Sequence, residues 1–277
     1  MSKESRGIDR LALIVHSLCR HRWVSIGLFG LCVLFGGSVP DARAQGVDEF
    51  GPYGGREDLS RLESPQNFAL ELRFGPYLPN VDQEFSGAAT PFRDVFGSTD
   101  RLMVGTEFDW QAFRVENVLS LGPGVGVSYT ALSARAPLAS GDGRADQRTK
   151  LKILPTWLVG VLRIDALARL TPVPLAFSAK VGLGHALWWA SDGDGTSTAD
   201  DGSKGRGRSY GYTYSAGAML DLSFLEPSRA NHLDATTGVN HMYLIFEWYA
   251  LELDGFGSGN VMNVGDRNWM LGLAMDW

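Results

Sequence analysis

The chain has 277 residues, with 25 Lys plus Arg against 31 Asp plus Glu, a net charge of −6 and two cysteines. Binding to a phosphate backbone needs concentrated positive charge, so this balance argues against a nucleic-acid partner. Because Cys19 and Cys32 both lie near the N-terminus, the rest of the chain offers no thiol or disulfide chemistry.

Residues 1–44 predict a secretory signal peptide. Basic residues between Lys3 and Arg22 precede a run of 15 uncharged residues, 23–37. That run is shorter than the roughly 20 apolar residues of a membrane-spanning helix, although an uncleaved anchor is the alternative. A small-x-small pattern ends at Ala44, and we expect cleavage there. Cleavage would remove both cysteines and leave a chain with a net charge of −9.

Residues 45–66 are polar and interrupted by Gly and Pro, and we predict a periplasmic N-terminal tail. The remaining part, 67–277, contains eight segments of strand character, namely 67–77, 101–112, 122–134, 151–164, 174–189, 209–224, 242–253 and 267–277. Apolar residues at every second position predict strands with one apolar face. The segment 151–164 is apolar on both faces, so its phase stays open, and the phase of 242–253 is less clear than that of the others.

The polar faces of these segments distinguish a barrel in lipid from a soluble sandwich. Long Lys and Arg side chains usually cover the wet face of a soluble sheet. Here that face is rich in Gly, Ser and Thr, with few charges, which suits a narrow barrel interior where charges pair out of bulk water. The predicted lumen charges are Glu71, Arg73, Glu107, Asp109, Lys180 and Asp221.

The connections between the segments differ in length, and only the third inner one, 225–241, is longer than an inner turn is expected to be. Those predicted to face outside are 78–100, 135–150, 190–208 and 254–267, and those predicted to face the periplasm are 113–121, 165–173 and 225–241. Long outer loops, short inner turns and an even strand number are typical of outer-membrane barrels. The sequence therefore predicts an all-β fold, an antiparallel up-and-down transmembrane β-barrel of about eight strands.

Aromatic residues gather at the ends of the predicted strands. Phe68, Trp110, Phe224 and Trp277 fall at inner ends, and Tyr77, Trp188, Trp189, Tyr210 and Trp269 fall at outer ends. Two such groups match the aromatic girdles that sit at both lipid–water interfaces.

The C-terminal segment alternates large apolar residues at Trp269, Leu271, Leu273, Met275 and Trp277. It resembles the C-terminal signal by which the barrel assembly machinery recognises bacterial outer-membrane barrels, with Trp277 where the signal usually has Phe. We expect this strand to direct insertion into the outer membrane of a Gram-negative cell.

The stretches NFALELRFGPYLPNVD (67–82), LSLGPGVGVSY (119–129) and GVNHMYLIFEWY (238–249) resemble a family of small outer-membrane β-barrel proteins from myxobacteria and their relatives. The general plan is also similar to the eight-stranded membrane domains of the OmpA and OmpW types. The resemblance implies architecture, and it assigns no catalytic or binding residue.

Catalysis is the less favoured reading of this sequence. Some eight-stranded barrels modify lipids with His and Ser near the outer rim, and here His185 with Ser128 or Ser133 is the available pair. His232 and His241 fall in or beside an inner turn, on the wrong side for such chemistry. We predict no catalytic site, no cofactor and no metal.

The loop 191–208 alternates Asp and Gly at its start but lacks the further ligands of an EF-hand. The preferred reading is a solvated surface loop whose charges meet lipopolysaccharide phosphates, with calcium binding as the alternative. The predicted partners are the lipid bilayer and lipopolysaccharide, and the oligomeric state stays open. The predicted role is structural or surface-facing. The alternatives are a porin-like or OmpW-like passage for small apolar solutes, a lipid-modifying enzyme, and a soluble secreted β protein.

Overall fold

The computed structural model of the chain describes residues 67–85, 89–115, 117–137, 143–192, 195–197, 204–225, 237–258 and 261–277. The predicted signal peptide and periplasmic tail lie outside these residues. Within them, no helix has both the length and the apolar character needed to cross a membrane.

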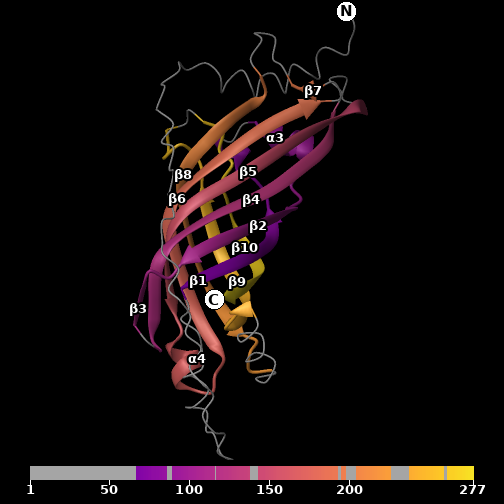
Figure 1. Ribbon diagram of the computed structural model, residues 1–277. Helices are drawn as coiled ribbons and strands as arrows, with labels where there is room; N and C mark the ends of the chain where they lie inside the picture. Colours follow the sequence, from indigo (N-terminus) through magenta and orange to yellow (C-terminus); the bar gives the residue numbers. More distant parts are fainter. Residues whose placement is uncertain are drawn as a thin grey trace, which may run out of the picture. The chain divides into compact units, whose positions relative to one another are not determined.

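The described residues form an antiparallel sheet with a few short helices (Figure 1). The strands are β1 (Phe68–Tyr77), β2 (Arg101–Trp110), β3 (Phe113–Val115), β4 (Leu119–Pro137), β5 (Arg144–Ile164), β6 (Leu175–Asp192), β7 (Gly195–Thr196), β8 (Arg206–Asp221), β9 (His241–Glu252) and β10 (Asp266–Asp276). The helices are η1 (Val81–Glu84), α3 (Pro91–Phe96) and α4 (Ala166–Leu170).

Eight of these strands close into a barrel. Each pairs antiparallel with the next in the order β1, β2, β4, β5, β6, β8, β9, β10, and β10 pairs back to β1 from Ala69↔Asp276 to Phe74↔Leu271. At the seam the backbone N–H of Phe68 donates to the carbonyl of Trp277 at 2.8 Å. The predicted closed, eight-stranded antiparallel barrel is confirmed. We call the end at which β1 begins and β10 ends the inner end.

Side chains alternate between the two faces of the wall along most of its strands. Large apolar residues point outward from every wall strand and stay 41–67% exposed, among them Leu72, Phe74, Leu102, Val104, Val125, Leu158, Val181, Leu183, Phe246 and Leu271. The open phase of β5 is settled because Leu158 is exposed while Trp157 and Val159 are buried inside. That strand is apolar on both faces because large apolar side chains also fill the interior there.

Strands extend into two of the predicted outer loops. The ladder between β4 and β5 continues to Arg135↔Arg148 and, past an irregularity, to Pro137↔Arg144, so the predicted loop 135–150 is wrong over most of its length. Likewise β6 runs to Asp192 and β8 starts at Arg206, which shortens the predicted loop 190–208. These strand ends are polar on their outward face, and an apolar pattern therefore does not reveal them.

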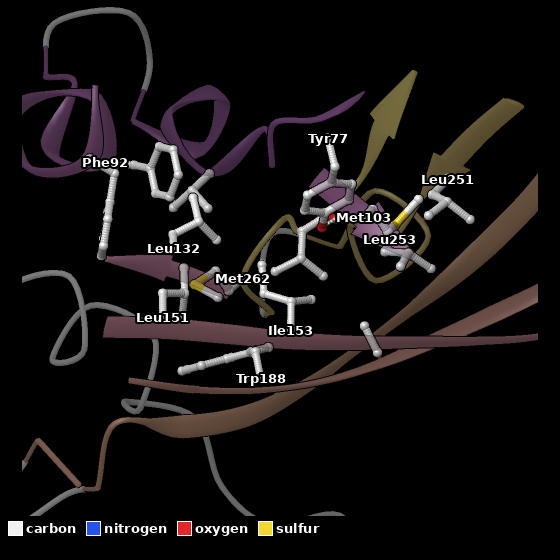
Figure 2. Packing of buried hydrophobic residues seen from close by; sticks show 14 of the residues in the cluster. Tyr77, Phe92, Met103, Leu132, Leu151, Ile153, Trp188, Leu251, Leu253 and Met262 are labelled. Carbon is white, nitrogen blue, oxygen red and sulfur yellow. Dashed lines mark hydrogen bonds between the residues drawn. The ribbon is translucent and has the colours of Figure 1, made fainter. Parts of the chain in front are cut away.

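An apolar cluster fills the outer half of the interior (Figure 2). Tyr77, Met103, Ile153 and Trp188 from the wall pack with residues from the outer connections, including Phe92, Val95 and Phe96 of α3 and Met262 and Val264 before β10. The carboxylate of Asp82 accepts the backbone N–H groups of Phe92 at 2.8 Å and Arg93 at 3.0 Å, which fixes the first turn of α3. Residues of the outer connections thus pack into the outer end of the barrel.

Candidate functional site

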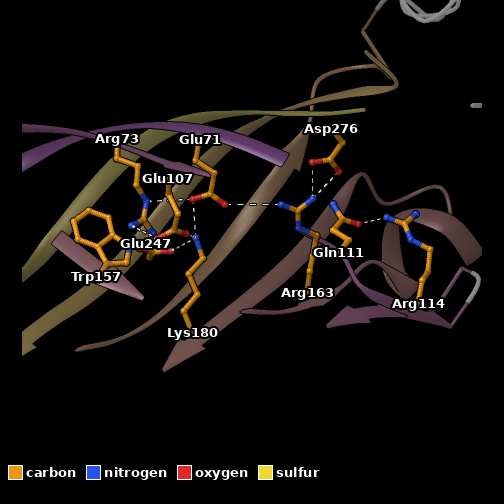
Figure 3. Close-up of polar contacts among 10 residues, drawn as sticks. All are labelled: Glu71, Arg73, Glu107, Gln111, Arg114, Trp157, Arg163, Lys180, Glu247 and Asp276. Atoms are coloured by element: carbon orange, nitrogen blue, oxygen red, sulfur yellow. Dashed lines mark hydrogen bonds and ion pairs between the residues drawn. The ribbon is translucent and has the colours of Figure 1, made fainter. Parts of the chain in front are cut away.

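A layer of charged side chains fills the interior on the inner side of the apolar cluster (Figure 3). It consists of Glu71, Arg73, Glu107, Asp109, Arg163, Lys180, Glu247 and Asp276, none of them more than 5% exposed. Each lies at an inward position of its strand, because alternation sends the neighbouring apolar residues out to the other face. Burying ionised groups costs free energy unless they are paired, so the pairing decides what this layer can do.

Lys180 is the centre of the layer. Its ammonium lies 2.6 Å from Glu71 Oε2 and 3.6 Å from Glu247 Oε2, and it also donates to Glu107 Oε1. It stands on β6, four strands away from β1 in either direction around the wall, so its side chain meets that of Glu71 coming from the opposite side of the barrel. One lysine thereby ties together carboxylates from three strands.

Arg73 engages the same three carboxylates from the other side. Its Nε lies 3.2 Å from Glu71 Oε2 and its Nη1 lies 3.3 Å from Glu107 Oε2, while its Nη2 donates to Glu247 Oε1. Its guanidinium also lies 5.7 Å from the centre of the Trp157 ring, and the indole N–H donates to Glu107. The arginine and the lysine neutralise a group of carboxylates that could not stay ionised alone.

A second pairing extends the layer toward the inner end. Arg163 Nη1 donates to both oxygens of Asp276, at 2.7 and 2.6 Å, and its Nη2 lies 3.8 Å from Glu71 Oε1. Its guanidinium lies 5.6 Å from the centre of the Tyr243 ring. Glu71 therefore links the two groups into one continuous network across the barrel.

The carboxylates of Glu71, Glu107 and Asp109 each bring an oxygen within 4.8 Å of the others, which is the spacing of a cation site. Two of them already bind the ammonium of Lys180, which takes the place that a metal ion would need. Asp109 has both oxygens buried with no hydrogen-bond partner among the described residues. The chemistry of this group is that of an internal ion-pair network.

Glycines of β4 make room for the largest members of this layer. A Cβ on Gly126 would overlap the indole of Trp157, and a Cβ on Gly124 would overlap Asp109 Oδ1. The repeated glycines in 122–126 therefore have a packing reason.

The space that remains between the charged layer and the apolar cluster is a cavity of about 20 Å³, room for about one water molecule. Arg73, Trp157 and Lys180 line it together with Tyr249 and Met270 from the outer half. Buried side chains of the charged layer and of the apolar cluster lie on the two sides of this cavity. An eight-stranded barrel is expected to be filled by its side chains in this way.

We therefore expect the protein to show no stable open-channel conductance in planar lipid bilayers. A sixteen-stranded porin recorded under the same conditions is the positive control. Reproducible ohmic steps that persist after repurification would contradict the filled interior.

The outer connections are held by a partly buried acid, Glu84. Burial raises the pKa of the Glu84 carboxyl from its usual 4.5 to about 7, although the N–H of Asn263 donates to it and opposes the shift. Because the folded state binds the proton more tightly than the unfolded state, this contribution to stability is complete below about pH 4.5 and is lost as pH rises through 7.

Protection of segment 78–100 from proteolysis or hydrogen exchange is therefore expected to fall between pH 5 and pH 8. Glu84→Gln should flatten that dependence, because the amide does not titrate. An unchanged pH profile in the variant would show that another group controls this segment.

The structure places the predicted lumen charges as follows. Glu71, Arg73, Glu107, Asp109 and Lys180 lie in the buried layer. Asp221 lies at the inner end of β8, partly buried, where its Oδ2 is 2.9 Å from His241 Nδ1. The predicted set omits Arg163, Glu247 and Asp276. Alternation along their strands would have predicted inward positions for Glu247 and Asp276. It could not do so for Arg163, because its strand is apolar on both faces.

Two of the predicted girdle residues are wrong. Tyr77 is fully buried and donates its hydroxyl to the carbonyl of Val264, and Trp188 packs inside the apolar cluster. Both stand at inward positions of their strands, so closeness to a strand end did not mean exposure to lipid. The other seven point outward or lie at the rim: Phe68, Trp110, Phe224, Trp277, Trp189, Tyr210 and Trp269.

One further aromatic residue joins the outer rim. Phe256, in the connection before β10, has a φ of 58° and packs on Tyr212 and Tyr210 with ring centres 4.6 and 5.6 Å apart. Nothing in its own stretch of sequence signals this, because the contact depends on a loop that turns back over the wall. At the inner rim Phe108 links Phe68 and Trp277, at 5.5 and 6.2 Å.

The structure does not bring the serine and histidine candidates together. Ser128 is buried inside the barrel, whereas His185 belongs to the outward row of β6. Ser133 faces outward, but it and His185 pair with different residues of β5. Ser133 pairs with Lys150, and His185 pairs with Thr156. Six residues of offset correspond to roughly 20 Å along the strands.

A different trio, Ser223, His241 and Asp221, lies at the inner end. The Ser223 hydroxyl is 3.4 Å and the Asp221 carboxylate 2.9 Å from the same nitrogen, His241 Nδ1. A nucleophile–base–acid triad needs the serine and the acid on opposite ring nitrogens. This arrangement fixes the imidazole and does not activate the serine.

The proposed calcium loop lies partly outside the described residues, which include Asp192, Lys204, Arg206 and Arg208 but not Asp194, Asp200 or Asp201. Calcium binding by 191–208 therefore stays the untested alternative to a solvated surface loop.

A scan against protein-family models finds no match, and no curated protein matches the chain. The resemblance to a myxobacterial family therefore stays a prediction.

Among solved structures, the chain is similar to Ail, the attachment invasion locus protein of Yersinia pestis, at 10% identity and a TM-score of 0.39 over 76% of this chain and 97% of that one. It is also similar to the outer membrane protein OprG from Pseudomonas aeruginosa, at 13% identity and a TM-score of 0.44 over 78% and 97%. A third is Neisserial surface protein A, at 11% identity and a TM-score of 0.38 over 76% and 97%.

Proposed function

We propose that the chain is an integral outer-membrane β-barrel protein with a structural or surface-interaction role and no catalytic site. The observation that carries the proposal is the apolar belt on the outward face of the closed wall. Monomeric soluble proteins rarely expose contiguous apolar patches larger than a few hundred Å². A belt of large side chains on all eight wall strands is stable in lipid and would aggregate in water.

The height of the belt supports the same proposal. On β10 the outward apolar residues run from Trp269 to Trp277, and on β1 from Phe68 to Pro76. A tilted strand needs about 9–11 residues to cross the hydrocarbon layer. The closed ladder also satisfies the backbone groups that lipid cannot, which is the condition for any spanning sheet.

The finer assignment follows from the predicted leader and terminal strand. The chain would be exported by a signal peptide cleaved after Ala44, inserted by the barrel assembly machinery through its C-terminal strand, and surrounded by phospholipid and lipopolysaccharide. The filled interior supports a structural or surface role over a pore. We propose no enzyme activity, because neither histidine described above is placed to activate a serine.

Cell fractionation with intact-mass measurement tests this assignment. The protein is expected in the outer-membrane fraction, with a mass of residues 45–277 and no acyl adduct. Recovery from the soluble periplasm without detergent would reject the membrane proposal. A mass that includes residues 1–44 would reject cleavage only.

A second candidate is a lateral passage for small apolar solutes, favoured by one observation. The β4–β5 ladder runs to Val127↔Thr156 and resumes at Thr130↔Ile153, beside Pro155, which has no N–H to donate. Uptake of an apolar dye by vesicles carrying wild type or Pro155→Val would test it. Equal uptake by the two proteins would leave the structural role as the better account.

A further inference from the structure

The outer ends of four neighbouring strands project past the rest of the wall (Figure 1). β2 pairs with β4 only as far as Val104↔Tyr129, whereas β4 continues along β5 to Pro137↔Arg144. β5 in turn pairs with β6 to Lys150↔Ser191, and β6 with β8 to Trp189↔Arg206. This part of the sheet stands beyond the apolar belt, on one side of the barrel.

The outward face of the projecting sheet is mainly basic, although the row that holds Arg148 and Lys150 on β5 begins with an exposed acid, Asp146. We call the basic patch the set Arg135, Arg148, Lys150, Lys152, Arg206 and Arg208. Lys152 is half-buried and the other five are exposed. In the described part of the chain, none of the six forms an ion pair. The chain as a whole is negative, so the patch is a local concentration of positive charge.

The register brings these charges side by side. Arg135 on β4 stands directly opposite Arg148 on β5, and such partners have Cα atoms about 4.5–5.5 Å apart. Like charges directly opposite each other destabilise a sheet. On the next strands Trp189 lies between Lys152 on one side and Arg206 on the other. A counter-anion bound across these strands would remove the repulsion.

The position of the patch selects the kind of anion. The patch begins where the apolar belt ends. Leu154 and Leu187, which pair with each other, are the last belt residues here. The first patch residues are Arg208, which pairs with Leu187, and Lys152, two residues beyond Leu154 on the same face. Trp189 sits at this boundary, as interfacial tryptophans do. An anion that meets the patch is thus held at the level where lipid headgroups begin.

We propose that the basic patch binds the phosphate groups of a glycolipid in the outer leaflet, with Trp189 packed against its sugar or the start of its acyl chains. Arginine and lysine suit this ligand, because guanidinium groups bind phosphate oxygens in pairs and ammonium groups act as point charges. The inference rests on the proposed membrane location and assigns one face of the barrel to the lipid.

The test uses protein extracted from membranes in detergent, titrated with bisphosphorylated lipid A and with its monophosphorylated form. Lys152→Gln with Arg206→Gln removes the two charges beside Trp189. Arg93→Gln with Arg267→Gln is the matched control, because it removes two exposed charges at the same end but outside the patch. Each cation near an anionic lipid surface contributes about 1 kcal/mol, so the paired change is expected to weaken binding roughly thirty-fold.

The control variant should bind lipid A within about two-fold of the wild-type affinity. Loss of one lipid phosphate should reduce the affinity of wild type more than that of the patch variant. Heat-modifiable migration on gels checks that every variant is folded. Equal binding by patch variant and wild type, or equal loss in the control, would overturn the inference. So would tighter binding of a soluble sulfated polysaccharide than of lipid A through the same residues. A barrel that inserts normally but ignores lipid phosphates refutes this inference alone, whereas failure to enter membranes refutes the proposed function.

Discussion

Replacing Leu273 with Arg should sharply reduce insertion of the barrel into lipid vesicles. Leu273 points outward from the middle of β10, where it pairs with Leu72 on one side and Leu244 on the other. An arginine at the bilayer midplane of a barrel costs about 2–4 kcal/mol. The folded fraction, measured by heat-modifiable migration and by urea titration in vesicles, should fall accordingly.

Depth in the membrane provides the control for this prediction. Leu102 is also apolar, outward and more exposed, but it stands next to the outer end of β2. Near the interface an arginine costs only about 0–1 kcal/mol, so Leu102→Arg should insert almost normally. If both variants lose equal stability, the belt does not face lipid. If truncation of Met275–Trp277 leaves insertion unchanged, the terminal strand is not the insertion signal.

The second large effect is expected inside the barrel, at Arg73. Arg73→Met removes the guanidinium that faces Glu71, Glu107 and Glu247. Lys180 then remains to balance all three carboxylates, with Arg163 contacting Glu71 alone. Removing one partner of a buried ion pair costs about 3–5 kcal/mol, because the other charge stays buried without compensation. Urea unfolding in detergent or vesicles should show a loss of this size.

Arg267 provides the matched comparison, because it is also an arginine on the barrel wall that pairs with a glutamate, Glu252. Its side chain is 58% exposed, so Arg267→Met should change stability by less than about 1 kcal/mol. Adding Glu247→Met to Arg73→Met should recover part of the loss, because it removes one stranded charge. A double variant no more stable than Arg73→Met would show that Glu247 is balanced by other groups.

The closed barrel could be predicted because alternation with a period of two is a local property of each strand. Phe68 to Phe74 and Trp269 to Trp277 show it clearly, and their registers place them in the same wall. The loop 135–150 was mispredicted for a physical reason. Arg148 and Lys150 are exposed on the outward face, so that stretch of strand has no apolar outward face to reveal it.

The identity of many interior charges could be predicted, but their partners could not. Alternation is enough to turn Glu71 and Lys180 inward. Their ion pair, however, joins strands on opposite sides of the barrel, and its geometry follows from closure and register together. Tyr77 and Trp188 were predicted wrongly although the needed signal is local. Their inward direction could be read from Arg73 and Ala186 by alternation. Their position near strand ends instead suggested contact with lipid.

The unequal strand lengths give the outer surface two levels. The eight residues of β4 from Thr130 to Pro137 extend about 26 Å along the strand, or about 20 Å in height at a typical tilt of about 40°. An antibody or protease approaching from outside should therefore touch the tips of β4 and β5 first. The ends of β1 and β2, low on the opposite flank, would be shielded by whatever sugars crowd the membrane surface. Recognition from outside would then depend on a rim only half a circle wide.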